Sequence, residues 1–172
     1  MITDLILFLS RFIVLLLAQV VLLNNIQFSG FINPFVYIMF IMMLPVRIPN
    51  ALLLVIAFFT GLVVDMFTNT MGMHAAACVF MAFTRPSVLK LLAPRDGYEA
   101  ESSPSAREMG FTWFMIYAAI LTLIHHFVLF YIEVFRFSEF FSTFLRVILS
   151  SVATLIVIMI SQYLFGKPVN EK

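Results

Sequence analysis

The residues of this sequence that could do chemistry are a few ionisable side chains within long apolar stretches. They are Asp65, His74, His125, His126, Glu133 and Arg146. Imidazoles and carboxylates are ligands for transition metals, and a carboxylate also forms an ion pair with a guanidinium group. An ionisable side chain inside an apolar segment is energetically unfavourable, so each of these residues needs a partner or a function.

The spacing of the histidines does not favour a metal site or a proton path. His125 and His126 are consecutive, so their side chains point about 100° apart on a helix. Metal ligands on one helix are instead found at positions i and i+4, as in His-Glu-x-x-His. A proton path would need a second carboxylate within the apolar stretches as a relay. We therefore expect no metal and no cofactor.

An ion pair between Asp65 and Arg146 is the interpretation that the sequence favours. Arg146, Ser150 and Thr154 are spaced by four and form one polar stripe on a helix. Either charge alone would cost about 2.5–3.5 kcal/mol at the centre of a membrane. Pairing gives a physical reason for both charges, and it would hold the segment that contains Asp65 to the last apolar segment.

Small residues precede Asp65 on the same helical face. Ala57, Gly61 and Asp65 are spaced by four, so they form a stripe that lets a neighbouring backbone come close. The carboxylate at the end of this stripe then faces protein rather than lipid. Asp65 therefore marks an internal contact or a site.

The composition indicates which kind of element positions these side chains. Of 172 residues, 63% are hydrophobic and 11% are charged, which is typical of an integral membrane protein. A spanning helix needs about 17–25 mostly apolar residues. This length predicts one all-α domain over residues 1–172 with six transmembrane helices, at 5–24, 31–45, 50–68, 72–92, 110–135 and 141–165. A polar loop is predicted at 95–108.

The second predicted helix is short because Pro34 and Pro45 bound it. The alternatives to a full span there are a tilted or partly interfacial helix and a re-entrant segment, which would change the topology. The only cysteine is Cys78, so no disulfide within the chain is possible.

Basic residues are distributed unevenly between the two sides of this topology. With six spans, the side of both termini carries Arg47, Arg85, Lys90, Arg95, Arg107, Lys167 and Lys172, and the other side carries only Arg136. The positive-inside rule then places both termini in the cytoplasm. The rise of about 1.5 Å per residue places Asp65, the three histidines, Glu133 and Arg146 toward the outer side.

Motifs of enzymes are missing from the sequence. It contains no Gly-x-Ser-x-Gly and no phosphate-binding Gly-x-x-x-x-Gly-Lys, and Ser150-Ser151 has no evident base beside it. We expect a protein without catalytic activity that acts in the lipid bilayer and has no nucleic-acid partner.

A motif at residues 61–86 carries a resemblance to a known family. It reads Gly61-Leu-x-x-Asp65, Gly72-x-His74-Ala75 and Phe83-Thr-Arg85-Pro86. With this motif, its length and its predicted spans, the chain resembles the bacterial rod shape-determining protein MreD family. The resemblance implies that Gly61, Asp65, Gly72 and Ala75 set the hairpin between the third and fourth helices.

The same resemblance implies a function and partners. The protein would be a non-enzymatic scaffold in the bacterial cytoplasmic (inner) membrane that binds the single-span protein MreC. It would help to couple cytoplasmic MreB filaments to peptidoglycan synthesis by RodA and a class B penicillin-binding protein, and thereby to control cell shape.

A substrate-binding membrane subunit of an energy-coupling-factor vitamin transporter is the alternative. Such a subunit is similar in size, span count and orientation, and the MreD fold is thought to resemble it. Asp65, His74, His126 and Arg146 would then contact a ligand in a cavity of the outer half. The first helix, with Arg11 and Ala18, lacks the Ala-x-x-x-Ala stripe expected for docking the coupling subunit.

Overall fold

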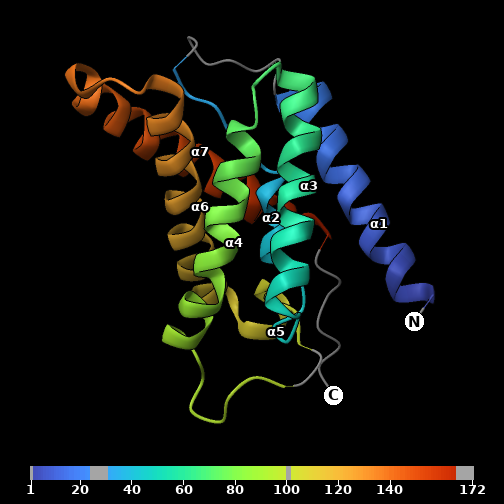
Figure 1. The fold of residues 1–172 in the computed structure, drawn as a ribbon. Helices are drawn as coiled ribbons and strands as arrows, with labels where there is room; N and C mark the ends of the chain where they lie inside the picture. Colours follow the sequence, from blue (N-terminus) through green and yellow to red (C-terminus); the bar gives the residue numbers. More distant parts are fainter. Residues whose placement is uncertain (1, 24–30, 100–101, 166–172) are drawn as a thin grey trace.

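The computed structural model describes residues 2–23, 31–99 and 102–165, and within these ranges the chain is helical and has no β-strand. The helices are α1 (Ile2–Leu17) with its π-helical continuation η1 (Ala18–Leu22), α2 (Ile38–Met42), α3 (Asn50–Thr68), α4 (Met73–Leu91), α5 (Ala106–Met109), α6 (Phe111–Val134), a 3-10 turn η3 (Phe137–Glu139) and α7 (Phe140–Phe165). The long helices form a bundle whose connections lie at its two ends (Figure 1). We call the end with turn 69–72 the hairpin end and the end with residues 92–105 the loop end.

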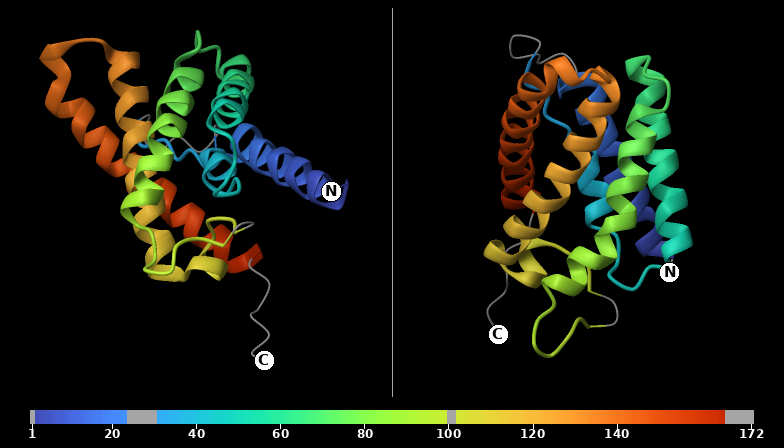
Figure 2. Two further views of the ribbon diagram at one scale, coloured as in Figure 1. Left: turned by 60° about the horizontal axis from the view of Figure 1, so that its bottom comes forward. Right: turned by 60° about the vertical axis from the view of Figure 1, so that its left-hand side comes forward.

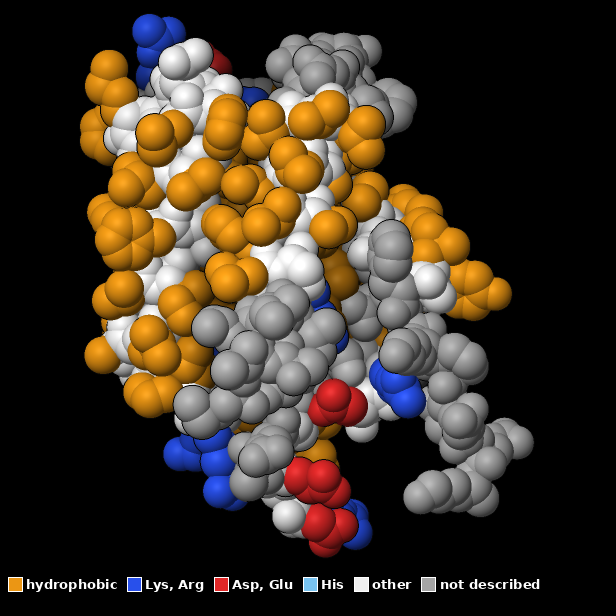
Figure 3. All heavy atoms as spheres, turned by 90° about the vertical axis from the view of Figure 1, so that its right-hand side faces the viewer, with side chains coloured by type: hydrophobic (Ala, Val, Ile, Leu, Met, Phe, Trp, Pro, Cys, Tyr) orange, Lys and Arg blue, Asp and Glu red, His pale blue; other side chains and the backbone are white. Residues whose placement is uncertain are grey.

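The molecule is an all-α membrane protein. Three of the described helices, α3, α6 and α7 as far as Leu164, are long and apolar enough to cross a bilayer, and Leu9–Leu22 is a shorter apolar helix. Apolar side chains cover most of one face of the molecule, and charged side chains lie toward its ends (Figure 3). This is the surface pattern expected of a protein that is surrounded by lipid.

Most of the predicted helices are found as helices. The ranges 50–68, 72–92, 110–135 and 141–165 correspond to α3, α4, α6 and α7, with ends that differ by at most one residue. The first predicted helix corresponds to α1 with η1, and its predicted end at residue 24 lies outside the described residues, as do Lys167 and Lys172.

The predicted helix over 31–45 is wrong. Only Ile38–Met42 is helical, and residues 33–35 have no regular secondary structure. Pro34 has no N–H to donate within a helix and disfavours helical geometry at Asn33, and Pro45 similarly limits the other end. The stretch from Pro34 to Met39 is nevertheless buried, because it lies inside the bundle and α2 contacts α1, α3, α4 and α6 (Figure 2).

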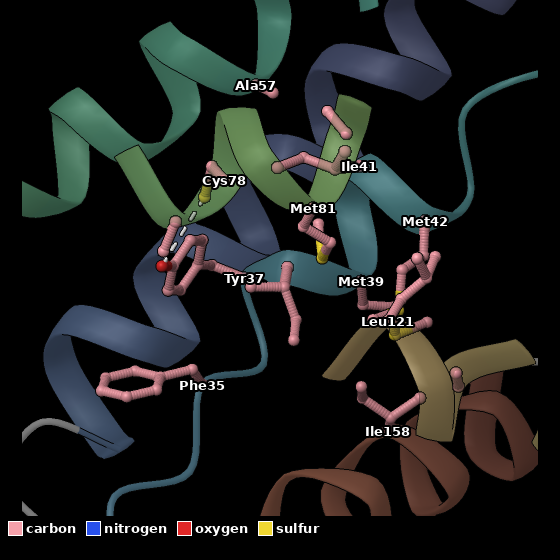
Figure 4. Close-up of a cluster of buried hydrophobic side chains, with 14 of the residues drawn as sticks. Phe35, Tyr37, Met39, Ile41, Met42, Ala57, Cys78, Met81, Leu121 and Ile158 are labelled. Atoms are coloured by element: carbon pink, nitrogen blue, oxygen red, sulfur yellow. Dashed lines mark hydrogen bonds between the residues drawn. The ribbon is translucent and has the colours of Figure 1, made fainter. Parts of the chain in front are cut away.

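The core of the bundle forms around α2. Tyr37, Met42, Met81, Leu121 and Ile158 are at most 1% exposed and bring α2 together with α4, α6 and α7 (Figure 4). In a bilayer the lipid is as apolar as these side chains, so close van der Waals packing rather than escape from water holds such a core together.

The predicted loop at 95–108 is attached to the bundle at the loop end. The Tyr98 hydroxyl donates to the Leu89 carbonyl at 2.7 Å, and the Val46 N–H donates to the Ser102 carbonyl at 3.0 Å. The short helix α5 closes the loop, with the Ser105 hydroxyl accepting from the Glu108 N–H at its start. The loop is therefore an anchored connection between α4 and α6.

Candidate functional site

Asp65 lies at the end of α3 and binds the beginning of α4. Its Oδ1 accepts from the His74 N–H at 3.0 Å, and its Oδ2 accepts from the Ala75 N–H at 2.9 Å. The Thr70 hydroxyl also donates to Oδ1, and His74 Nδ1 lies 3.1 Å from the same oxygen. The side chain of Asp65 is buried, so these contacts replace its hydration.

Asp65 thereby caps a neighbouring helix rather than its own. The first N–H groups of a helix have no intrahelical acceptor, and the positive end of the helix dipole favours a carboxylate there. Gly72 immediately precedes α4 with φ = 81°, a conformation that glycine adopts without the steric penalty of a Cβ. The α3–α4 turn therefore places the two N–H groups against the carboxylate.

Gly61 allows this contact because it is the point of closest approach between α3 and α4. A Cβ at Gly61 would lie 2.5 Å from Ala75 Cα and 2.5 Å from the His74 carbonyl oxygen. Both are backbone atoms, so they do not yield as the end of a side chain would. The small-residue stripe of the sequence thus corresponds to a close helix–helix contact, with Ala57 also fully buried.

The structure corrects the predicted ion pair between Asp65 and Arg146. Arg146 Nη1 lies 3.2 Å from Glu133 Oε2, and the guanidinium carbon lies 4.2 Å from the centre of the Phe130 ring. Asp65 is instead bound by His74, Ala75 and Thr70. The pairing follows from connectivity, because α6 and α7 are joined by a short connection that brings Glu133 opposite Arg146.

The two consecutive histidines of α6 contact different neighbours. His125 Nε2 is 2.8 Å from the Tyr37 hydroxyl, whereas His126 Nε2 is 3.1 Å from the Thr154 hydroxyl. Each histidine therefore joins α6 to a different element. Within the described parts of the chain, no group of three or more His, Cys, Asp or Glu side chains is placed to hold a metal ion.

The irregular segment before α2 is held by side chains of η1 and α7. The Ser150 hydroxyl accepts from the Asn33 N–H at 3.1 Å, and the Thr154 hydroxyl accepts from the Phe35 N–H at 3.0 Å. Gln19 accepts from the Val36 N–H at 2.8 Å and donates to the Pro34 carbonyl at 3.1 Å. Non-helical backbone at membrane depth requires such partners, because lipid offers none.

A cavity of about 290 Å³ opens at the hairpin end beside this segment. Its polar lining includes Arg146, Glu133, His74, Thr70 and Asn33. The remaining lining residues are Gln19, Leu23, Pro34, Phe35, Phe67, Thr68, Met73 and Leu129. The cavity thus combines one cation, one anion, hydrogen-bonding groups and apolar walls, as small-molecule sites do.

Of the residues proposed as ligand contacts, His74 and Arg146 line this cavity. Asp65 and His126 do not, because Asp65 caps α4 and His126 contacts Thr154 and the Thr122 carbonyl. Glu133, which the sequence indicated only as a group near the outer interface, belongs to the lining through its pairing with Arg146.

Arg85 is a buried charge whose environment the sequence did not reveal. It is 1% exposed, and its Nε donates to the Tyr117 hydroxyl at 2.8 Å. Its Nη2 donates to the carbonyls of Met42, at 3.3 Å, and of Leu44, so the guanidinium binds the carboxyl end of α2. Arg85 lies six residues before the end of α4. This position inside the helix was the one indication in the sequence that Arg85 is not a cation at the membrane surface.

A second hollow is an apolar groove on the outer surface between α3 and α4. Its volume is about 890 Å³, and its walls include the exposed side chains of Phe58, Met66, Phe80 and Phe83. Gly72, Ala75, Ala76 and Val79 also line the groove. Small side chains at this position let another helix approach closely.

Comparison with known proteins gives no match, whether with family models, with curated proteins or with solved structures. The function of this chain therefore has to be argued from its own residues and their geometry.

Proposed function

We propose that this protein is a non-enzymatic scaffold subunit of the bacterial cell-elongation complex, as its resemblance to the MreD family implies. The observation that carries the proposal is the apolar groove between α3 and α4, which would receive the single membrane span of an MreC-like partner. Through that partner the protein would help to couple MreB filaments to peptidoglycan synthesis by RodA and a class B penicillin-binding protein.

The groove is formed by the same hairpin that contains the family-like motif. Asp65, which also lines the groove, and Gly61 hold α3 and α4 close together. Ala76 lies exposed in the groove, with Phe80 and Phe83 further along the same helix. A groove with small and aromatic residues suits a helix, because small residues let another helix approach closely.

The proposed topology has six crossings of the bacterial cytoplasmic membrane. The second crossing would be made by residues 31–49 in irregular and short helical form, enclosed by the other helices. The loop end, where Arg47, Arg95 and Arg107 lie, would face the cytoplasm together with both termini, and Arg136 would lie on the outer side. A fold like that of energy-coupling-factor substrate-binding subunits belongs to this proposal.

The test is cross-linking of the tagged protein in bacterial membranes, extraction in mild detergent and identification of co-purifying proteins by mass spectrometry. The variant Ala76→Trp fills the groove from an exposed position. Val152→Trp is its matched control, because Val152 is an exposed, apolar residue of α7 outside the groove.

We expect the unmodified protein and Val152→Trp to recover an MreC-like protein with cell-wall synthases, and Ala76→Trp to lose at least nine-tenths of this recovery. Equal recovery by both variants would show that the partner binds elsewhere. Failure of the unmodified protein to recover any MreC-like protein would refute the scaffold role.

The cavity at the hairpin end favours a second candidate, the substrate-binding subunit of an energy-coupling-factor vitamin transporter. It is lined by His74, Glu133 and Arg146 at the hairpin end, which would be the outer end in the proposed topology, and such a subunit would hold its ligand there. Recovery of transporter ATPases with their coupling subunit in the same experiment would support this candidate and contradict the scaffold.

A further inference from the structure

We propose that the cavity at the hairpin end binds a small zwitterion of the α-amino acid type, with an ammonium group at Glu133, a carboxylate or phosphate at Arg146 and an apolar side chain between Phe35 and Phe67. The inference does not depend on the scaffold role, since it concerns an internal cavity and not the groove between α3 and α4.

The charges of the cavity suit a zwitterion better than a simple anion or cation. Arg146 Nη1 and Glu133 Oε2 are 3.2 Å apart, and their side chains are 18% and 40% exposed. The ammonium nitrogen and carboxylate oxygens of an α-amino acid are also about 3 Å apart. Four charges can therefore alternate around one small ring, whereas a ligand with one charge would bring that charge close to the like charge of Arg146 or Glu133.

The hydrogen-bonding capacity of the lining is not used up within the protein. Arg146 Nε and His74 Nε2 are both buried and have no hydrogen-bond partner among the described residues. Leaving a buried polar atom unsatisfied is unfavourable. A ligand that draws the Arg146 guanidinium inward would give its Nε an acceptor, so binding would also relieve this cost.

The volume and the apolar walls of the cavity indicate the size and the uncharged part of the ligand. A volume of about 290 Å³ lies at the small end of the range for ligand sites, so the ligand is a single small molecule or a headgroup rather than a peptide. Phe35, Phe67, Met73 and Leu129 supply apolar wall, which matches an apolar side chain. Two sources offer paired charges with an apolar part: a free amino acid with its side chain, and a phosphoethanolamine lipid with its acyl chains.

The experiment measures the thermal unfolding midpoint of the protein in nanodiscs of phosphatidylglycerol. The probes are L-leucine and L-phenylalanine, and the controls are 4-methylpentanoate and 3-methylbutylamine, which each keep only one of leucine's two charges. A second set of nanodiscs contains phosphatidylethanolamine without any soluble probe, to test the headgroup.

Two substitutions make the test specific. Glu133→Gln removes the proposed ammonium partner from a position that is 40% exposed, so the fold is expected to survive. Arg136→Gln is the matched control, because Arg136 pairs with Glu139 at 3.8 Å at the same end of the molecule and does not line the cavity.

At about 100-fold excess over its Kd, a binding probe raises the unfolding midpoint by about 5–10 °C. We expect such a shift with leucine or phenylalanine if the ligand is a free amino acid, or with phosphatidylethanolamine if it is a headgroup. The shift should disappear in Glu133→Gln and persist in Arg136→Gln. Absence of a shift in all arms, an equal shift with a singly charged analogue, or a shift that survives Glu133→Gln would overturn the proposal.

Discussion

Asp65 and Arg85 are two buried charges of opposite sign that are stabilised in the same way at opposite ends of the bundle. Asp65 accepts hydrogen bonds from the N–H groups at the start of α4. Arg85 donates to the carbonyl groups at the carboxyl end of α2. Each charge thus meets the complementary end of a helix dipole instead of an oppositely charged arginine or aspartate.

The two regions differ in how far along the chain the partners lie. Asp65 binds residues nine and ten positions away, within one hairpin. Arg85 binds carbonyls more than forty positions away and shares them with Tyr117, which donates to the Met42 carbonyl at 2.9 Å. Asp65 and Arg85 are therefore both accommodated at a helix end, one local and one remote.

Breaking the remote contact is expected to have the largest effect. Arg85→Met removes the donor from the carbonyls of α2 and from the Tyr117 hydroxyl, so the free energy of unfolding should fall by about 4 kcal/mol. Unfolding by dodecyl sulfate in mixed micelles, followed by circular dichroism, measures it. The control Lys90→Met, an exposed position of the same helix, should change stability by less than about 1 kcal/mol. Equal losses in the two variants would mean that Arg85 has no special role.

Separating α3 from α4 is expected to cause the second-largest loss of stability. Gly61→Ala places a methyl group 2.5 Å from the Ala75 backbone, so α3 and α4 must move apart and the hydrogen bonds of Asp65 must lengthen. We expect a loss of about 3 kcal/mol in the same unfolding assay, at the upper end of the cost of overpacking. Ala51→Leu enlarges an exposed residue of α3 and should be nearly neutral. An unchanged stability of Gly61→Ala would show that the hairpin is loosely packed.

Removing only the charge of Asp65 is expected to lower the free energy of unfolding by a smaller amount. Asp65→Asn keeps one acceptor oxygen but loses the attraction between carboxylate and helix end, so we expect a loss of about 2 kcal/mol. The double variant Asp65→Arg with Arg146→Asp tests the alternative of a direct ion pair. Because the two side chains have other partners, the double variant should be no more stable than the sum of its single changes predicts. Partial rescue would instead favour the direct pair.

Breaking the exposed ion pair between Glu133 and Arg146 is expected to have the smallest effect on stability. Glu133→Gln leaves Arg146 with its contact to Phe130, and the pair is open to solvent on the side of Glu133. Without added ligand we expect a change of about 0.5 kcal/mol or less in the unfolding assay. A loss comparable to that of Asp65→Asn would show that the pair is shielded and that the contrast with the helix ends is incorrect.

The sequence predicted the elements whose signals are local. The apolar stretches of α3, α4, α6 and α7 are long, so ranges predicted from span length differ little from the structure. Pro49 and Asn69 bound α3, and Gly72 and Gly110 precede α4 and α6. The close contact at Gly61 likewise follows from a spacing of four within one helix. In these cases the residues that decide the structure are neighbours in the sequence.

The sequence did not predict the elements that depend on distant partners. Pro34 disfavours a helix over residues 33–35, and the N–H groups of Asn33 and Phe35 find their acceptors in Ser150 and Thr154, more than a hundred positions away. The partner of Arg146 and the burial of Arg85 depend in the same way on which helices become neighbours. Composition and periodicity describe one segment at a time, so they cannot identify such pairings.

The side chains that hold residues 33–36 also constrain the order in which the segments of the protein insert into the membrane. The acceptors for the N–H groups of Asn33 and Phe35 are Ser150 and Thr154, in the last helix of the described chain. Until the ribosome has synthesised α7, these two N–H groups lack their acceptors in the hydrocarbon, where unpaired backbone groups are strongly disfavoured. The segment must therefore wait at the translocon or the membrane surface, so insertion of the first part of this protein is completed by its last part.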